Sequence, residues 1–134
     1  MNKNSMTYTI IFIFLVSFAF VFLLSLTNIA TVDQIDANEE LARRRAILSA
    51  LGVEYSGEED INSTYEQDIV GDVDAGLFVY EGPAGTVYAK RFIGAGLWGS
   101  IEGFLAVSGD FDQLVGLEIV DHNETPGLGG RITE

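Results

Sequence analysis

The stretch LFVYEGPAGTVYAKRFI, residues 77–93, decides the fold class of this chain. Its two halves, residues 77–81 and 86–93, are rich in β-branched and aromatic residues, which favour β-strands. The four residues between them, GPAG, are residue types that dominate tight turns. The stretch therefore predicts an antiparallel β-hairpin.

A second hairpin is predicted immediately downstream. SIEGFLAVS (100–108) and LVGLEIVDH (114–122) have the same strand composition, and the turn residues GDFD (109–112) separate them. The four strands together predict an antiparallel meander. A sheet of this kind buries only one face well when a single helix packs on it.

The helix that would cover this sheet is predicted over DQIDANEELARRRAILSALGV (33–53). Acidic residues crowd its first half, basic residues follow, and Gly52 is placed to end it. Its apolar stripe consists of Leu41, Ile47, Leu48 and Leu51. Residues 54–72 are acidic and weakly periodic, so we expect a loop there, with a short helical turn near residues 62–68.

Charges around this helix indicate a solvated face. The consecutive residues Arg43, Arg44 and Arg45 splay over most of the helix circumference. They are interpreted as partners of Glu39 and Glu40 in surface ion pairs, and the alternative is a basic patch.

The first part of the chain is apolar. No residue from Asn4 to Val32 carries a charge, and YTIIFIFLVSFAFVFLLSL (8–26) is close to the roughly 20 residues that cross a bilayer core. We interpret it as a transmembrane anchor. The alternative, a cleaved signal peptide, has an apolar core of about 7 to 15 residues and a small-x-small site, which residues 28–30 fit poorly. We expect a single pass through the inner, or cytoplasmic, membrane, with the soluble part extracytoplasmic.

Charge and cysteine content exclude several classes of partner and cofactor site. Twenty acidic and six basic residues follow Val32, so this part of the chain carries a net charge of −14 and is unsuited to nucleic acid. Such a charge also repels anionic lipid headgroups. The chain has no cysteine, which excludes disulfides, thiolate metal sites and iron–sulfur clusters bound by this chain alone.

Two glycine-rich connections, GAGLWG (94–99) and ETPGLGG (124–130), flank the last strand pair. In a meander they fall at the same end of the sheet. Glycine lets the backbone approach a flat or anionic ligand closely, Trp98 supplies an aromatic face, and Thr125 supplies a hydroxyl. The pattern suits an aromatic cofactor with polar edges, and the alternative is two ordinary turns with Trp98 in the core. Neither run has the strand–loop–helix context of a Rossmann or P-loop phosphate site.

His122 is the only histidine, and it precedes Glu124 by two residues. In a strand this spacing places both side chains on one face, as in a proton-handling pair or half a metal site. The alternative is a structural hydrogen bond. We assign no catalytic residue and no metal site to this chain.

Three segments in order, ELARRRAILSALGV, GLWGSIEGFLAV and LVGLEIVDHNETPGLGGRI, resemble the FMN-binding family over residues 40–134. The family includes flavoprotein subunits of sodium-pumping NADH:quinone reductases and of Rnf complexes, and GLWG favours the former. The resemblance implies one N-terminal transmembrane helix and an α+β domain that relays electrons through FMN between other membrane subunits. It implies that Leu97, Trp98 and Gly99 contact the isoalloxazine. It also implies that the other edge of the isoalloxazine is lined by Glu124, Thr125, Gly127 and Leu128.

The sequence departs from this family in one respect. Family members join FMN through its phosphate to a threonine in a Ser/Thr-Gly-Ala-Thr motif, and no Gly-Ala-Thr occurs in this chain. We therefore expect the covalent attachment residue to be absent and the rest of the site to lie beyond Glu134. The chain alone is expected to be inactive. Alternative functions are a free-standing, membrane-anchored FMN-binding module and a cofactor-free remnant of such a subunit.

The expected organisation is an α+β protein in three parts. Residues 1–32 form the tail and transmembrane anchor, residues 33–75 form a helical and acidic connection, and residues 76–134 form the first part of an incomplete FMN-binding domain with an antiparallel sheet.

Overall fold

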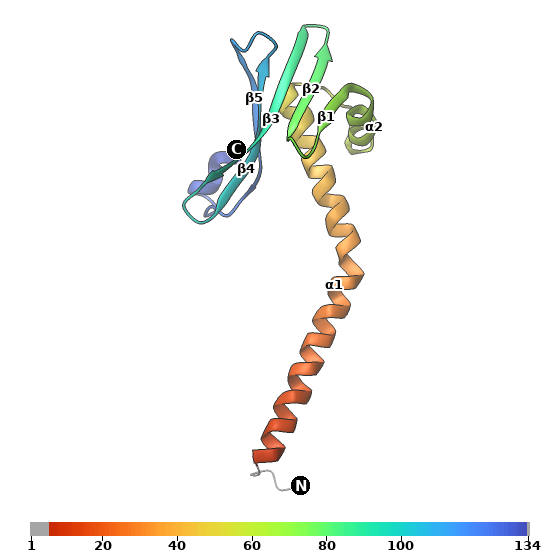
Figure 1. The fold of residues 1–134 in the computed structure, drawn as a ribbon, viewed down its shortest axis with the longest axis vertical. Helices are drawn as coiled ribbons and strands as arrows, with labels where there is room; N and C mark the ends of the chain where they lie inside the picture. The colour runs from red at the N-terminus through yellow and green to blue at the C-terminus, as the bar shows by residue number, and fades with distance from the viewer. Residues whose placement is uncertain (1–5, 134) are drawn as a thin grey trace. The chain divides into compact units, whose positions relative to one another are not determined.

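A computed structural model describes residues 6–133, which divide into two compact units at Asn38 and Glu39. The elements, in chain order, are α1 (Met6–Leu51), α2 (Glu58–Asp68), β1 (Ile69–Asp72), β2 (Leu77–Gly82), β3 (Gly85–Ala95), β4 (Ser100–Ser108), β5 (Leu114–His122) and the 3₁₀ helix η1 (Gly129–Thr133) (Figure 1).

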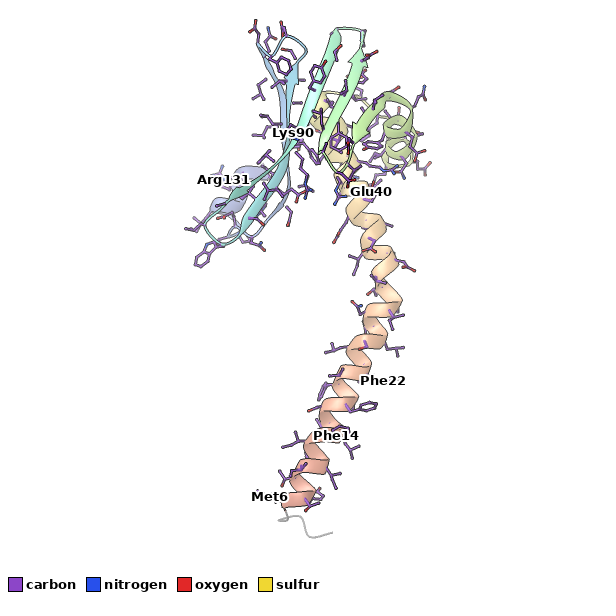
Figure 2. The ribbon with its side chains drawn as sticks, viewed as in Figure 1. Met6, Phe14, Phe22, Glu40, Lys90 and Arg131 are labelled. Carbon is purple, nitrogen blue, oxygen red and sulfur yellow. The ribbon has the colours of Figure 1, made fainter. Side chains whose placement is uncertain are left out.

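The first unit is the apolar part of α1. Among residues 6–133, α1 is the one helix that is long and apolar enough to cross a membrane, and no residue of its most apolar stretch is buried. The hydroxyls of Thr27 and Thr31 donate to the carbonyls of Leu23 and Thr27, at 2.9 and 3.0 Å. These hydroxyls are therefore satisfied within the helix, as an apolar environment requires. Figure 2 shows Phe14 and Phe22 projecting from this part of α1.

α1 is longer than the sequence predicted. Two helices, over residues 8–26 and 33–53, were expected, and the structure has one helix from Met6 to Leu51. Residues 27–40 contain neither proline nor glycine, so nothing in the backbone ends the first helix before the second begins.

The end of α1 is where the sequence predicted it. Gly52 has φ +73°, and its N–H donates to the Ser49 carbonyl at 3.0 Å. The N–H of Val53 donates to the Leu48 carbonyl at 2.9 Å. These two bonds form a Schellman motif, in which glycine takes the left-handed conformation without a steric penalty.

The sheet has one strand more than predicted. Within the described residues it contains five antiparallel strands in the order β1-β2-β3-β4-β5, so both predicted hairpins are confirmed. The extra strand is β1, where Ile69 pairs with Tyr80 and Val70 with Val79. The acidic segment before it is also more regular than expected, because α2 covers 11 residues. Such a short strand in an acidic context carries little periodic signal, and pairing with β2 is what orders it.

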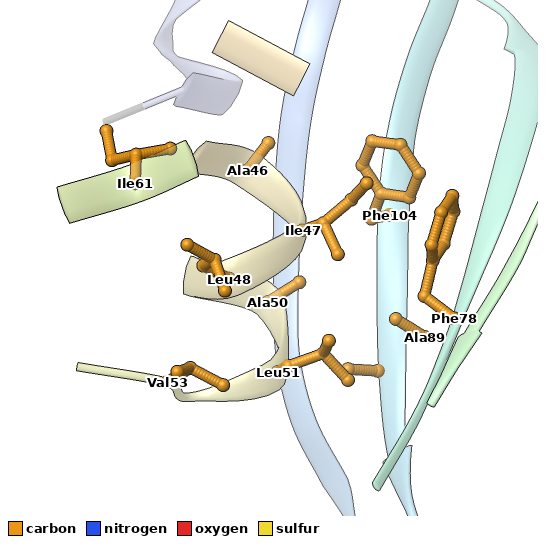
Figure 3. Close-up of a cluster of buried hydrophobic side chains, with 11 residues drawn as sticks. Ala46, Ile47, Leu48, Ala50, Leu51, Val53, Ile61, Phe78, Ala89 and Phe104 are labelled. Atoms are coloured by element: carbon orange, nitrogen blue, oxygen red, sulfur yellow. The ribbon is translucent and has the colours of Figure 1, made fainter. Parts of the chain in front are cut away.

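The core lies between the last turns of α1 and one face of the sheet. Figure 3 shows Ile47 and Leu51 of α1 pointing toward Phe78, Ala89 and Phe104 of the sheet. The rings of Phe78 and Phe104 meet edge to face, with centroids 5.6 Å apart. The predicted apolar stripe is confirmed: Ile47, Leu48 and Leu51 are buried and Leu41 packs against the core.

The opposite face of the sheet remains apolar and exposed in the described residues. Leu105 lies between the buried residues Phe104 and Ala106 on β4, so it faces away from α1 and is 39% exposed. Its partner on β5, Leu117, is 53% exposed. This agrees with the expectation that a single helix covers only one face.

Arg44 of α1 forms hydrogen bonds with residues of α2. Its guanidinium donates to Glu40 and Glu66, both at 3.0 Å, and to Asn62 at 3.2 Å. It also lies 4.9 Å from the ring centroid of Tyr65. The hydrogen bond to Glu40 is the main cause of the raised pKa of Arg44. The predicted pairing of the basic run with Glu40 is confirmed, whereas the predicted pairing with Glu39 does not occur among the described residues. The run also reaches α2 through Glu66 and Glu58.

Candidate functional site

The two glycine-rich connections lie at the same end of the sheet, as predicted. β3 ends at Ala95 and β4 begins at Ser100, so residues 96–99 form the connection between them. The second connection leaves β5 after His122 and leads into η1, which contacts β5 (Figure 1). The N–H of Gly96 donates to the Gly99 carbonyl at 2.7 Å and closes the first connection into a tight loop.

The second connection contains a type II turn. The N–H of Leu128 donates to the Thr125 carbonyl at 3.1 Å, and Gly127 has φ +76°. A type II turn favours proline at its second position and requires positive φ at its third, which Pro126 and Gly127 satisfy. The N–H of Gly130 also donates to the Thr125 carbonyl, at 2.9 Å. The run TPGLGG therefore forms a hydrogen-bonded turn whose shape follows from its own residues.

Glu124 joins the two connections. Its Oε1 accepts hydrogen bonds from the backbone N–H groups of Leu97, at 2.7 Å, and Trp98, at 3.3 Å. Two successive N–H groups that converge on one oxygen form a small anion-binding concavity. The side chain of Glu124 therefore anchors the 96–99 loop to the second connection.

The surface formed by these loops is apolar and exposed. Leu97, Trp98 and Leu128 are 80%, 67% and 75% exposed. The only tryptophan of the chain thus lies outside the core, contrary to the alternative that makes it a core residue. Thr125 is also exposed, and a Cβ on Gly127 would meet no atom within 4 Å, so space is open beside the turn.

The sequence did not point to Asn123. A Cβ on Gly99 would lie 2.6 Å from the Asn123 amide nitrogen, so the absence of a side chain on Gly99 lets Asn123 lie against the loop. The signal for such a residue is weak, because a single asparagine after a strand is common in turns.

His122 has a structural role in this arrangement. Its Nδ1 accepts a hydrogen bond from the backbone N–H of Glu124 at 3.2 Å. β5 ends at His122, so the strand period does not extend to Glu124, and the two side chains do not form the pair that the spacing suggested. In the part of the chain that the structure describes, no group of three or more His, Asp or Glu side chains is placed to hold a metal ion.

The strands that lead into the 96–99 loop are joined by an ion pair. The Nε and Nη2 atoms of Arg91 on β3 donate to the two carboxylate oxygens of Glu102 on β4, at 2.7 and 2.8 Å. These hydrogen bonds lower the pKa of Glu102 and raise the pKa of Arg91. The two-point geometry restrains the base of the loop.

A cavity among the described residues lies elsewhere. It has a volume of about 1010 Å³ and is lined by the β2–β3 and β4–β5 turns and the end of α1, including Glu54, Asp68 and Asp110. The glycine-rich loops do not contribute to it. The candidate site is instead marked by its exposed apolar side chains, which indicate a ligand there.

Comparisons with known proteins match the part of the chain that contains both loops. Residues 96–134 match the family of FMN-binding domains. The chain is also similar to the C subunit of the Na(+)-translocating NADH-quinone reductase. It is 49% identical to the Pseudomonas aeruginosa protein over 39 residues, which are 29% of this chain and 15% of that protein. It is 38% identical to the Pasteurella multocida protein over 60 residues, which are 43% of this chain and 23% of that protein.

A solved structure extends the similarity to the fold. The crystal structure of the same reductase component from Parabacteroides distasonis superimposes with a TM-score of 0.61 at 25% identity. The match covers 75% of this chain and 63% of that chain. The chain therefore spans less than two thirds of the relatives that it matches.

The residues at the loops fit the flat ring of FMN. A flat ring needs an apolar surface and close backbone approach, and the exposed Trp98 and Leu128 beside the open space at Gly127 offer both. The match to the FMN-binding family supports FMN as the cofactor. Residues 96–134 thus match the family of FMN-binding domains, and the chain resembles the C subunit of the Na(+)-translocating NADH-quinone reductase in sequence and in fold.

Proposed function

We propose that this chain is part of an electron-transfer flavoprotein subunit in a membrane-bound, ion-pumping NADH:quinone reductase. The observation that carries the proposal is the hydrogen bonding of Glu124 to Leu97 and Trp98, which holds the two glycine-rich loops together. Because the loops are joined, their exposed apolar side chains form one surface within the segment that matches FMN-binding domains.

In this proposal residues of the two loops contact the flavin at two of its edges. Leu97, Trp98 and Gly99 contact the isoalloxazine from the first loop. Thr125, Gly127 and Leu128 line the other edge, together with Glu124. FMN supplies the electron-transfer chemistry when it is bound, and the chain orients the ring and excludes water from it. The apolar surface is suited to excluding water from the ring. Burial and hydrogen bonding by the protein also tune the reduction potential of a flavin.

The proposed setting is the inner, or cytoplasmic, membrane. α1 anchors the chain by its length and composition, and residues 39–134 form the extracytoplasmic part. The partners are other membrane subunits of the reductase, through which electrons enter and leave, and transport of Na⁺ is the coupled process. A ferredoxin:NAD oxidoreductase of the Rnf type is the alternative complex.

The test is purification of the tagged full chain from its source membranes in mild detergent. We expect FMN and polytopic membrane subunits to co-purify with the wild-type chain. Trp98→Ala should lower the FMN content by about tenfold, the effect of losing an aromatic contact worth about 1.4 kcal/mol. Leu114→Ala is the matched control, because Leu114 is 63% exposed on β5 at the opposite end of the sheet.

Two results would contradict the proposal. One is a wild-type preparation with its membrane partners but without FMN. The other is unchanged FMN content in Trp98→Ala. Intact mass spectrometry and flavin fluorescence on a denaturing gel then decide how FMN is held, because only covalent flavin stays with the band.

A further inference from the structure

We propose that Glu124 is a positioning residue, whose carboxylate locks the 96–99 loop onto the turn at residues 125–130. The inference deepens the proposed function, because it says how that site is organised. Its geometry does not depend on a bound ligand.

The carboxylate contacts the loop through the backbone alone. Oε1 accepts from both Leu97 and Trp98, at 2.7 and 3.3 Å, so the side chains of these residues are free to face a ligand. Hydrogen bonds from N–H groups to a charged carboxylate are stronger than those between neutral groups. One side chain thereby fixes two consecutive peptide groups without covering the exposed Trp98 ring.

Two glycines make room for the carboxylate. A Cβ on Gly96 would overlap Oε1, and a Cβ on Gly129 would lie 2.7 Å from Oε2. The two oxygens of Glu124 are thus each packed against a glycine of a different loop. Neither glycine has positive φ, so space for the carboxylate is the structural requirement at both positions. The carboxylate thus accounts for Gly96 and Gly129, two glycines of the glycine-rich loops that contact with a flavin ring does not account for.

Leu97 and Trp98, in the middle of the loop, make little contact with the rest of the described residues. Leu97 and Trp98 are mostly exposed, and the backbone hydrogen bond within the loop joins Gly96 to Gly99. That bond closes the loop but does not connect it to residues 125–130. The position of Trp98 relative to Leu128 therefore depends on Glu124, together with the packing of Asn123 against Gly99.

The backbone N–H of Glu124 is also hydrogen-bonded, which restrains the chain at this residue. This N–H donates to His122 Nδ1 at 3.2 Å. The residue at the end of β5 therefore holds the chain that carries the carboxylate. His122 therefore acts on the loops through Glu124.

The test uses the detergent-solubilised full chain without added FMN. Trp98 is the only tryptophan, so its fluorescence anisotropy reports the order of the loop directly. Amide hydrogen exchange of Leu97 and Trp98 reports the two hydrogen bonds. Glu124→Ala should lower the anisotropy and speed exchange of both amides by about tenfold or more, as expected for loss of a hydrogen bond to a charged group.

Glu124→Gln is the conservative variant. Its amide oxygen can accept both hydrogen bonds, so it should restore most of the anisotropy and amide protection. Gly96→Ala leaves Glu124 in place but displaces its carboxylate, and should resemble Glu124→Ala. Glu81→Ala removes an exposed carboxylate from β2 and should match the wild type.

Each outcome separates this inference from the proposed function. Unchanged Trp98 anisotropy and amide exchange in Glu124→Ala would overturn the positioning role, and so would a Gln variant that behaves like Ala. A native preparation without FMN, combined with the expected loop effects, would overturn the proposed function and leave the positioning role standing.

Discussion

Gly116 of β5 lies directly against the backbone of Ala50 near the end of α1. A Cβ on Gly116 would overlap the Ala50 carbonyl oxygen and lie 3.0 Å from its Cα. Helix and edge strand thus approach each other to backbone contact. A side chain at this position is excluded because the atoms that it would meet belong to the backbone and cannot rotate away.

Gly116→Ala should therefore destabilise residues 39–134. Overpacking of a fixed contact costs about 1–3 kcal/mol, so the unfolding midpoint should fall in a thermal scan followed by circular dichroism. Gly94→Ala is the control, because a Cβ there meets no atom within 4 Å. Equal midpoints for the two variants would show that α1 does not approach β5 in this way.

Phe104 and Leu105 offer a paired test of which face of the sheet is the core. Phe104 is 0% exposed and Leu105 is 39% exposed, although they are neighbours on β4. Phe104→Ala should lower the free energy of unfolding by about 3–5 kcal/mol, and Leu105→Ala by about 1 kcal/mol. Denaturant titration in detergent measures both. A larger effect at Leu105 would place the core on the other face.

The ion pair of Arg91 with Glu102 should make stability depend on pH. Arg91 lowers the pKa of Glu102 in the folded state through two hydrogen bonds. The ion pair therefore contributes to the free energy of unfolding above the unfolded pKa of Glu102, about 4.3. This contribution is lost as the pH falls through the lower pKa of Glu102 in the folded state. Glu102→Gln should cost about 1 kcal/mol at neutral pH, because the pair is partly exposed.

The measurement is the unfolding free energy from pH 7 to 3 for the wild type and Glu102→Gln. The difference between the two should shrink as the pH falls below about 4. Glu81→Gln, which removes an exposed carboxylate from β2, should follow the wild type at every pH. A constant difference across the range would mean that the lowered pKa does not contribute to stability.

The uncovered face of the sheet should promote self-association. Leu117 lies on the edge strand β5 and is 53% exposed on that face. An exposed apolar edge is a template for pairing with another chain, and lysine on such an edge opposes it. Leu117→Lys should reduce the sedimentation coefficient of the detergent-solubilised chain. Val73→Lys, a change at an exposed apolar residue between β1 and β2, should leave it unchanged. Equal sedimentation coefficients for the wild type and the two variants would show that β5 is not the contact surface.

The parts of the fold that were predicted correctly depend on neighbouring residues. The GPAG turn and the end of α1 at Gly52 follow from the conformations that glycine and proline favour. The GDFD turn is where its residue types predicted a turn, but its residue with positive φ is Phe111. The apolar stripe of α1 follows from helical periodicity. The failure to predict β1 has the same explanation, because its four residues have little pattern of their own and are ordered by pairing with β2.

For the candidate site, the sequence placed two glycine-rich loops at one end of the sheet, and resemblance to a family supplied their expected ligand. It did not indicate what each glycine does. Gly127 provides a positive φ, whereas Gly96 and Gly129 provide room for a carboxylate. Only the first role is a local property that a turn motif can reveal.

By itself, the sequence determined the apolar helix, the hairpins and the shape of the TPGL turn, because these depend on local propensity and on hydrophobic period. Tertiary structure decided the contact of Gly116 with Ala50 and the bonding of Glu124 to a loop 27 residues earlier in the chain. Such contacts require strand register and helix packing to be set first. A carboxylate reaches a particular pair of N–H groups only after the sheet has brought both loops to the same end.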